Sequence, residues 1–349
     1  MPANGKIAVD PDFYLVDNKY EPSDFQSGPS DEQQFEALEA GHLVGVVMDS
    51  ETNNPLFQAP IKNPKVSIVL RNFFFGGWIS ILIKISAFLM SVLAEEAGQS
   101  QVRGVDLYPP PIDWMPPNCI LEVDDILQEW TWREKFDLIH IRLMLGSFTA
   151  PEWKSVYRQC YDNLEPGGWF EQFEGGCNVI SDDGSLPKDS CLASWGPNIV
   201  GAAARSGRSV DTLDTMRGEI KKAGFIELRE KVYKWPIGPW PRDPVLKEAG
   251  RLNWHMWKTG MDGYATYLLT KFGLPEPWSL ERVQVFVAKA RAEINNPKYH
   301  IYHVSRRIWA RKPTVKEAAS IFAEKEKAKK KEKDAGKSKT SQLTTPGLR

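Results

Sequence analysis

Acidic residues end two consecutive apolar runs of the sequence. Asp106 follows the run that begins at Gln101, and Asp124 and Asp125 follow the run that begins at Cys119. A carboxylate at the first position can accept both ribose hydroxyls of a nucleoside, and one at the second can accept the exocyclic amine of adenine. A lone acid such as Asp106 is also common as a turn or helix cap. The recurrence of acids at consecutive strand ends favours nucleoside binding.

Two basic side chains, His140 and Arg142, end the next apolar run, which begins at Phe136. In an open parallel sheet, ligands bind beyond the carboxyl ends of the strands, so both side chains would face a reacting group. His140 is the better candidate for a general base, because an imidazole can take a proton near neutral pH. The alternative is a packed structural histidine, and the sequence leaves both open.

The elements that would position these residues are short apolar runs separated by stretches with helical spacing. The runs cover 101–107, 119–125, 136–141, 169–173, 225–232 and 301–310. Strands that alternate with helices predict an α/β fold with a mostly parallel sheet. The stretch at about 233–298 is rich in tryptophan, too long for a simple connection and too apolar to be disordered. We expect it to form a helical cap over the open end of the sheet.

The composition of the chain gives expectations for its ends, its partners and its cysteines. Residues 1–30 are polar, and we expect them to form a disordered arm before a domain at 31–313. Residues 314–349 are rich in Lys and Glu, and we expect a frayed helix or a disordered tail there. Lys and Arg number 44 against 45 Asp and Glu, which gives no whole-chain basic field for nucleic acid. The four cysteines lack metal-ligand spacing, and no secretory signal is evident. We therefore expect reduced thiols, no metal, and a cytoplasmic or nuclear location.

Several motifs resemble those of one family. The turn Leu164-Glu-Pro-Gly-Gly-Trp-Phe-Glu171 and the run Phe136-Asp-Leu-Ile-His-Ile-Arg142 are similar to the fifth and fourth strands of class I S-adenosylmethionine-dependent methyltransferases. The segments 114–118, 129–132 and 235–244 resemble the fungal LaeA-like members, which include the velvet-complex regulator of secondary metabolism and many tailoring enzymes. The resemblance runs from about Tyr14 to Pro313.

The resemblance implies a Rossmann-like, seven-stranded class I methyltransferase sheet in the order 3-2-1-4-5-7-6, with an antiparallel last strand and a helical cap. It implies S-adenosyl-L-methionine as the cofactor, with the ribose on Asp106. Asp124 and Asp125 would lie at the adenine, with Asp125 accepting its amine and the backbone N–H of Ile126 making a further contact. The segment 138–145, which includes His140 and Arg142, would line the methyl-transfer side.

One segment, 65–90, departs from the family pattern. After Asn63-Pro64 the family has a strand-end acid and a Gly-x-Gly-x-Gly turn that lets the backbone approach the cofactor, and neither is present here. Residues 73–93 carry one charge, Lys84, and could span a bilayer, but a span there would cut the sheet between its first two strands. The alternatives are a divergent or inactive relative that uses Gly76-Gly77 as a reduced turn, and translated intron sequence in a gene-model error.

These patterns predict a methyltransferase that acts on a small-molecule secondary metabolite or in the regulation of secondary metabolism. Its partner would be a small-molecule acceptor or a regulatory protein. The alternative is a catalytically inactive relative that serves as a partner-binding scaffold, because the glycine-rich cofactor loop is missing. We expect neither nucleic acid nor a membrane as a partner.

Overall fold

A computed structural model describes residues 5–11, 31–52, 56–61, 64, 66–70, 101–106 and 117–341 of the 349-residue chain. Its helices are α1 (Asp31–Met48), α3 (Ala150–Asn163), α4 (Cys191–Arg205), α5 (Met216–Lys222), α6 (Pro244–Phe272), α7 (Leu280–Ile294) and α8 (Val315–Ser341). Its strands are β1 (Val66–Leu70), β2 (Gln101–Asp106), β3 (Cys119–Val123), β4 (Phe136–Arg142), β5 (Leu164–Gly175), β6 (Ile180–Ser181), β7 (Ile226–Ile237) and β8 (Ile301–Arg311).

The described strands form one mixed sheet in the order β3-β2-β1-β4-β5-β8, with β6 and β7 both paired to β8. Strands β1 to β5 are parallel, and β8 runs antiparallel to β5 and β7. The α/β class predicted from the alternation of strands and helices is confirmed. The sequence predicts seven strands, whereas the described residues form eight. The additional strand, β6, pairs with Ile301 and Tyr302, which lie beyond the part of β8 that pairs with β5.

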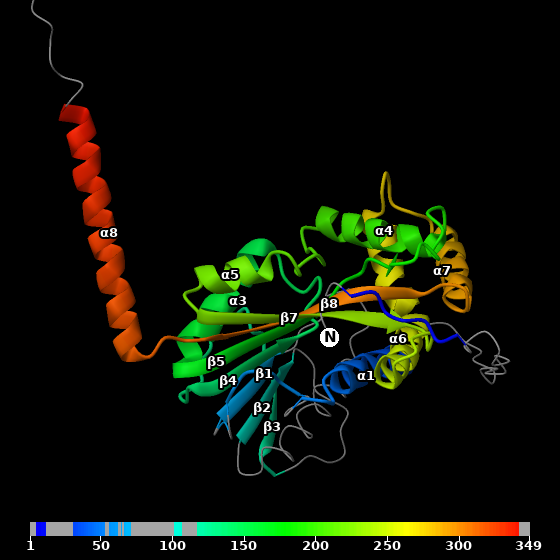
Figure 1. Ribbon diagram of the computed structural model, residues 1–349, viewed down its shortest axis with the longest axis horizontal. Helices are drawn as coiled ribbons and strands as arrows, with labels where there is room; N and C mark the ends of the chain where they lie inside the picture. Colours follow the sequence, from blue (N-terminus) through cyan, green and yellow to red (C-terminus); the bar gives the residue numbers. More distant parts are fainter. Residues whose placement is uncertain are drawn as a thin grey trace, which may run out of the picture.

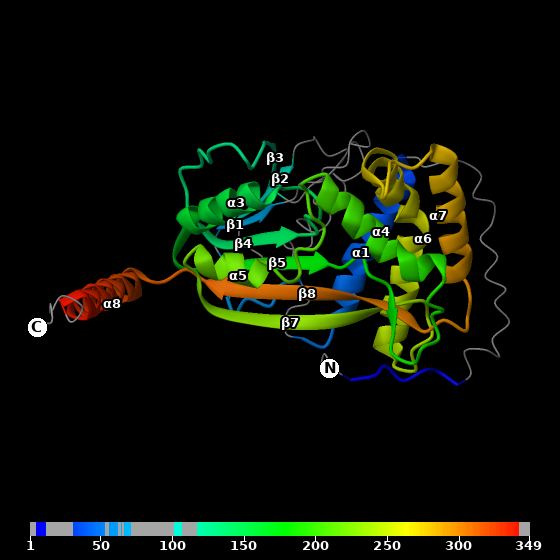
Figure 2. The same ribbon diagram turned by 90° about the horizontal axis from the view of Figure 1, so that it is seen from above.

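Apart from α8, the described helices lie on one face of the sheet or at its carboxyl edge. Figure 1 shows α3 and α5 beside each other on one face. In Figure 2 the arrowheads of β4 and β5 point toward α1, α4 and α6, so the carboxyl ends of these strands face a helical layer. Helix α6 packs against α1, α4 and α7. This layer lies where ligands bind in open α/β sheets.

Side-chain caps set where the long helices begin. Asp243 accepts the N–H of Leu246 at the start of α6, and Ser279 accepts the N–H of Arg282 at the start of α7. The sequence predicts a helical cap from residue 233, but residues 233–237 belong to β7 and pair with β8. Buried Tyr233 and Trp235 alternate along β7, which is the period of a strand.

Parts of both chain ends, where the sequence predicts a disordered arm and a frayed helix or disordered tail, are described by the structure. Residues 315–341 form α8, which projects from the body in Figure 1. Ala, Lys and Glu favour a helix even without packing, and Thr314 and Glu317 bond each other's backbone N–H groups at its start. Near the other end, Val9 pairs with Pro241 and Asp10 forms an ion pair with Lys247. Residues 12–30 lie outside the described part of the chain.

No helix within the described residues is long and apolar enough to cross a membrane. The candidate span at 73–93 and the rest of the atypical segment after Leu70 lie outside those residues.

Candidate functional site

The three predicted cofactor acids meet at one end of the β2–β3 pair. In the parallel register Asp106 pairs with Val123, so the two strands end side by side. Asp124 and Asp125 follow Val123 directly. Successive parallel strands thus bring acids that are separate in sequence to the same edge of the sheet.

The turn after β3 is held by its own side chains. The Asp125 carboxylate accepts the N–H of Leu127 at 3.0 Å and the side-chain amide of Gln128 at 3.1 Å. The exposed Asp124 accepts the N–H of Asp125 at 2.8 Å. Asp125 therefore has the turn-capping role that an acid at a strand end can take. Each carboxylate oxygen has two lone pairs, so the same group can still accept a bond from a ligand.

Ile126 anchors this turn to the body of the domain. Its side chain is buried, and its carbonyl accepts the indole N–H of Trp130 at 3.0 Å and the side-chain amide of Gln159 at 2.8 Å. Its own N–H has no acceptor among the described residues. The turn therefore presents two carboxylates and a backbone donor on a fixed frame.

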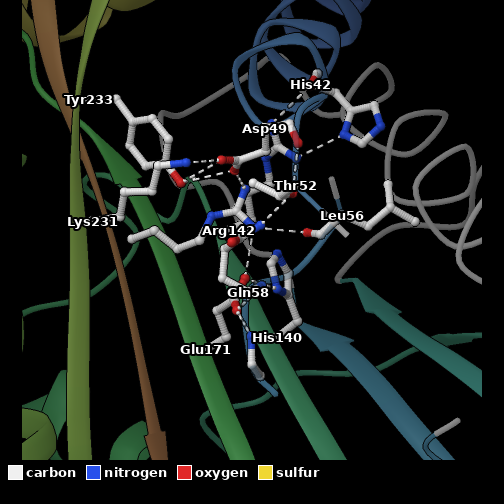
Figure 3. Close-up of polar contacts among 12 residues, drawn as sticks. His42, Asp49, Thr52, Leu56, Gln58, His140, Arg142, Glu171, Lys231 and Tyr233 are labelled. Carbon is white, nitrogen blue, oxygen red and sulfur yellow. Dashed lines mark hydrogen bonds and ion pairs between the residues drawn. The ribbon is translucent and has the colours of Figure 1, made fainter. Parts of the chain in front are cut away.

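His140 lies in the middle of the sheet, where β4 pairs with β5 at Glu171. Its Nδ1 is 3.4 Å from Glu171 Oε1, and both side chains are buried. Burial lowers the pKa of His140, and the attraction of Glu171 opposes that effect. Glu171 also accepts the N–H groups of Gln58 and Ala59 at 2.7 and 2.9 Å (Figure 3). The segment before β1 therefore fastens to the sheet beside His140.

Arg307 joins Glu171 to the end of α1. Its guanidinium is 3.0 Å from Glu171 Oε1 and 3.1 Å from Asp49 Oδ2, and all three side chains are buried. Burial raises the pKa of Glu171, but Arg307 and His140 outweigh it and hold that pKa below its usual value. Tyr233 and Lys231 donate to Asp49 from β7 (Figure 3). We call Asp49, His140, Glu171, Tyr233 and Arg307 the buried polar network.

Arg142, the second predicted catalytic residue, contacts α1. Its guanidinium donates to the carbonyl of Gly41 at 3.0 Å and to that of His42 at 3.2 Å. It is also 2.8 Å from Nδ1 of His42 (Figure 3). A Cβ on Gly45 would lie 2.7 Å from Arg142 Nη2, so glycine permits this approach. Arg142 thereby holds α1 over the carboxyl end of β4.

Glu174 fixes the loop that follows β4. Both of its carboxylate oxygens accept the N–H of Met144, at 3.2 and 3.0 Å, and Gln172 donates to it at 3.0 Å. Complete burial raises the pKa of Glu174 to about 7. The preceding Leu143 has a φ of 50°, a conformation that costs energy for a branched residue. The Glu174 bonds help to keep this strained turn in place.

The structure thus divides the predicted site residues into two groups. One group lies at the ends of β2 and β3 and comprises Asp106, Asp124, Asp125 and Ile126. In the other group, His140 belongs to the buried polar network and Arg142 contacts α1. Sequence reasoning missed Asp49, Glu174 and Arg307. Glu171 closes a recognisable motif, but Asp49 and Arg307 lie in segments whose local pattern gave no signal. Within the described residues, no group of three or more His, Cys, Asp or Glu side chains could hold a metal ion.

An α/β sheet with a central parallel set, an antiparallel strand beside β5 and acids at the ends of β2 and β3 defines the class I methyltransferase fold. No family model matches the chain. The secondary metabolism regulator LAE1 of Cochliobolus heterostrophus is 33% identical over 226 residues, which cover 63% of this chain and 72% of that protein. The chain belongs to the LaeA-like methyltransferase family.

Methyltransferase pytC of Aspergillus terreus is 35% identical over 212 residues, which cover 61% of this chain. The match covers 64% of pytC, so the chain spans just under two thirds of the length of that relative. Among solved structures, phosphoethanolamine N-methyltransferase 2 of Haemonchus contortus in complex with S-adenosyl-L-methionine matches with a TM-score of 0.40 and 16% identity. That match covers 73% of this chain and 50% of the other.

Proposed function

We propose that this chain is an S-adenosyl-L-methionine-dependent methyltransferase that acts on a small-molecule secondary metabolite or in the regulation of secondary metabolism. The observation that carries the proposal is the meeting of Asp106, Asp124 and Asp125 at the ends of two paired strands. The relatives support it, because they include the methyltransferase pytC and the secondary metabolism regulator LAE1.

The residues at this edge fit the nucleoside half of the cofactor. Carboxylates accept hydrogen bonds from ribose hydroxyls and from an exocyclic amine, and the N–H of Ile126 offers a donor to a ring nitrogen. The local bonds of Asp124 and Asp125 hold these groups in position before a ligand arrives. When bound, the cofactor would supply an activated methyl group on a sulfonium.

The remaining described residues would position the acceptor and exclude water. Glu174 fixes the loop after β4, and Arg142 holds α1 across the same edge. His140 stays the candidate for a general base, and its proximity to Glu171 would favour the protonated imidazole during proton transfer. An acceptor that arrives without a proton to lose would need no base.

Calorimetric titration of the full chain with S-adenosylhomocysteine tests the proposal. We expect micromolar binding, and Asp125→Ala should weaken it about tenfold, because a hydrogen bond to a charged group is lost. Asp214→Ala removes an exposed acid outside the site and serves as the control. Binding in the millimolar range, or equal loss in both variants, would contradict the assignment.

A second function is favoured by the sequence between residues 65 and 90. That segment contains Gly76 and Gly77 but no Gly-x-Gly-x-Gly turn. A chain without this turn would serve as a partner-binding scaffold, and undetectable S-adenosylhomocysteine binding by a well-folded chain would support that role. Transcript sequencing across this segment distinguishes a divergent loop from intron sequence in the reading frame.

A further inference from the structure

A groove opens between α4 and α7. The two helices contact each other and lie side by side, at the end of the molecule away from α8, in Figures 1 and 2. The groove has a volume of about 410 Å³, and its lining residues fall within 188–198 and 278–289. Small-molecule sites have volumes of roughly 300–1,000 Å³. No described lining residue belongs to the cofactor acids, the buried polar network or the loop after β4, so this groove is separate from the site described above.

The floor of this α4–α7 groove is apolar and fixed. The rings of Trp278 and Phe286 are buried and meet edge to face, with 5.3 Å between their centroids. Phe286 also stacks on Trp195 at 5.6 Å, and the Trp278 indole donates its N–H to the carbonyl of Leu274 at 3.0 Å. Val285 lines the same groove and is 54% exposed. A ligand therefore meets an apolar surface whose aromatic side chains are already held in place.

Three cations lie around this apolar floor. Lys188, Arg282 and Lys289 line the groove, and none of the three has an ion-pair partner within the described part of the chain. Asp189 is the one carboxylate among the described lining residues, so the lining carries three positive charges against one negative charge. The Arg282 guanidinium lies 3.8 Å from the centroid of the Trp278 ring. This stacking leaves the N–H edge of the guanidinium available to an acceptor.

The excess positive charge comes from side chains and not from the start of α4. Glu293 accepts the N–H groups of Cys191 and Leu192 at 3.0 and 2.8 Å. Ser190 accepts the N–H of Ala193 at 3.0 Å. These bonds use the donors that a helix start would otherwise offer to an anion. Burial and Glu293 raise the pKa of Cys191, so its thiol stays neutral and adds no charge. An anion in the groove would therefore be bound by the cationic side chains.

We propose that the α4–α7 groove binds a small organic carboxylate whose apolar body lies on Trp278, Phe286 and Val285. A guanidinium held flat against a ring can donate two parallel hydrogen bonds to a carboxylate, so Arg282 would bind both of its oxygens. The two lysines of the groove would add attraction without fixing the orientation, because an ammonium acts as a point charge. The groove shares no described residue with the cofactor acids, so this binding does not rest on the proposed methyltransferase function.

A matched pair of probes tests the need for a charge on the full chain without cofactor. 2-Naphthoate carries the carboxylate, and 2-naphthalenemethanol keeps the ring and replaces the carboxylate with a neutral hydroxymethyl group. We expect 2-naphthoate to bind about tenfold more tightly in a fluorescence titration, because charge-assisted hydrogen bonds are stronger than neutral ones. Arg282→Met keeps a long apolar side chain over Trp278 and should abolish this preference. Arg251→Met, which removes an exposed arginine of α6 that pairs with Glu248, is the control and should keep it.

A second pair of variants tests the apolar floor. Val285 and Leu280 are exposed apolar residues of α7, at 54% and 53%, and of the two only Val285 lines the groove. Val285→Glu should weaken 2-naphthoate binding about tenfold, because it places a second carboxylate beside the bound one, and should weaken 2-naphthalenemethanol binding less. Leu280→Glu makes a similar change outside the groove and should leave both affinities near those of wild type. Both positions are exposed, so neither change should unfold the chain.

Alkylation of Cys191 reports where the probe binds. This thiol lines the groove and is partly exposed, whereas the other three cysteines are buried. We expect 2-naphthoate to slow the reaction of Cys191 with iodoacetamide, measured by peptide mass, and an equal concentration of 2-naphthalenemethanol to slow it less. Equal affinity of wild type for the two probes, no binding of either, a preference that survives Arg282→Met, equal weakening by Val285→Glu and Leu280→Glu, or alkylation that 2-naphthoate does not slow would overturn the proposal.

Discussion

The carboxyl edge of the sheet holds charged side chains in two regions that differ in burial. At the ends of β2 and β3, Asp124 is exposed, and Asp125 is held by neighbours two and three residues away. Across β4, β5 and β8, Glu171 and Arg307 are buried and bond to segments more than 100 residues away. The carboxylates of the first region can accept further hydrogen bonds, whereas the hydrogen bonds and ion pairs of the second region connect distant segments of the chain.

The same kind of ion pair occurs in both regions. Arg103 pairs with Glu122 across β2 and β3, where the side chains are 18% and 30% exposed. Arg307 pairs with Glu171 where they are 1% and 0% exposed. Solvent screens the first pair. Loss of the arginine from the second pair leaves a buried carboxylate without its ion-pair partner. Replacement of Arg307 should therefore lower the free energy of unfolding far more than replacement of Arg103.

The largest effect is expected for Arg307→Met. This change leaves Glu171 buried without its arginine and removes one of the two cations beside Asp49, which keeps Lys231. Breaking such a buried pair costs about 3–5 kcal/mol. Urea unfolding of both proteins near neutral pH measures the difference. Arg103→Met is the matched control and should cost about 1 kcal/mol or less. Similar losses in the two variants would remove the distinction between the regions.

A smaller, pH-dependent effect is expected at Glu174. Its pKa is raised from 4.5 to about 7 in the folded chain, so the folded state keeps a proton that the unfolded state has released. Its contribution is present in full below the unfolded pKa and is lost as the pH rises through about 7. The loss amounts to about 3 kcal/mol, because one pKa unit corresponds to about 1.4 kcal/mol.

Glu174→Gln should remove this slope, since glutamine resembles the protonated acid and cannot titrate. Unfolding free energies of wild type and variant, measured from about pH 4 to about pH 8, should differ by an amount that changes by about 3 kcal/mol. Glu165→Gln makes the same chemical change at the exposed start of β5 and serves as the matched control. A parallel pair of curves for Glu174→Gln and wild type would show that this carboxyl does not couple to folding.

The contrast also explains which features of the fold and the site could be predicted from the sequence. Strand ends and their acids are local features, and alternation places Asp106 and Asp124 at one edge without knowledge of distant contacts. The roles of His140 and Arg142 depend on Glu171, Gly41 and His42, and no local pattern links residues 41 and 142. The two-residue β6 has too little sequence for a pattern, because its pairing comes from the overhang of β8.

The smallest effect is expected for Gly45→Ala, which tests the contact between α1 and Arg142. Gly45→Ala places a Cβ 2.7 Å from Arg142 Nη2, so the guanidinium must shift away from the carbonyls of Gly41 and His42. We expect a loss of about 1–3 kcal/mol in unfolding free energy, as for other overpacked sites. Gly218→Ala, in α5 with no atom within 4 Å of the new Cβ, should instead stabilise by about 0.5–1 kcal/mol. Opposite signs from the same chemical change would show that Arg142 positions α1. If Gly45→Ala also stabilised the chain, the guanidinium would be free to move, and Arg142 would return as a candidate for contact with substrate.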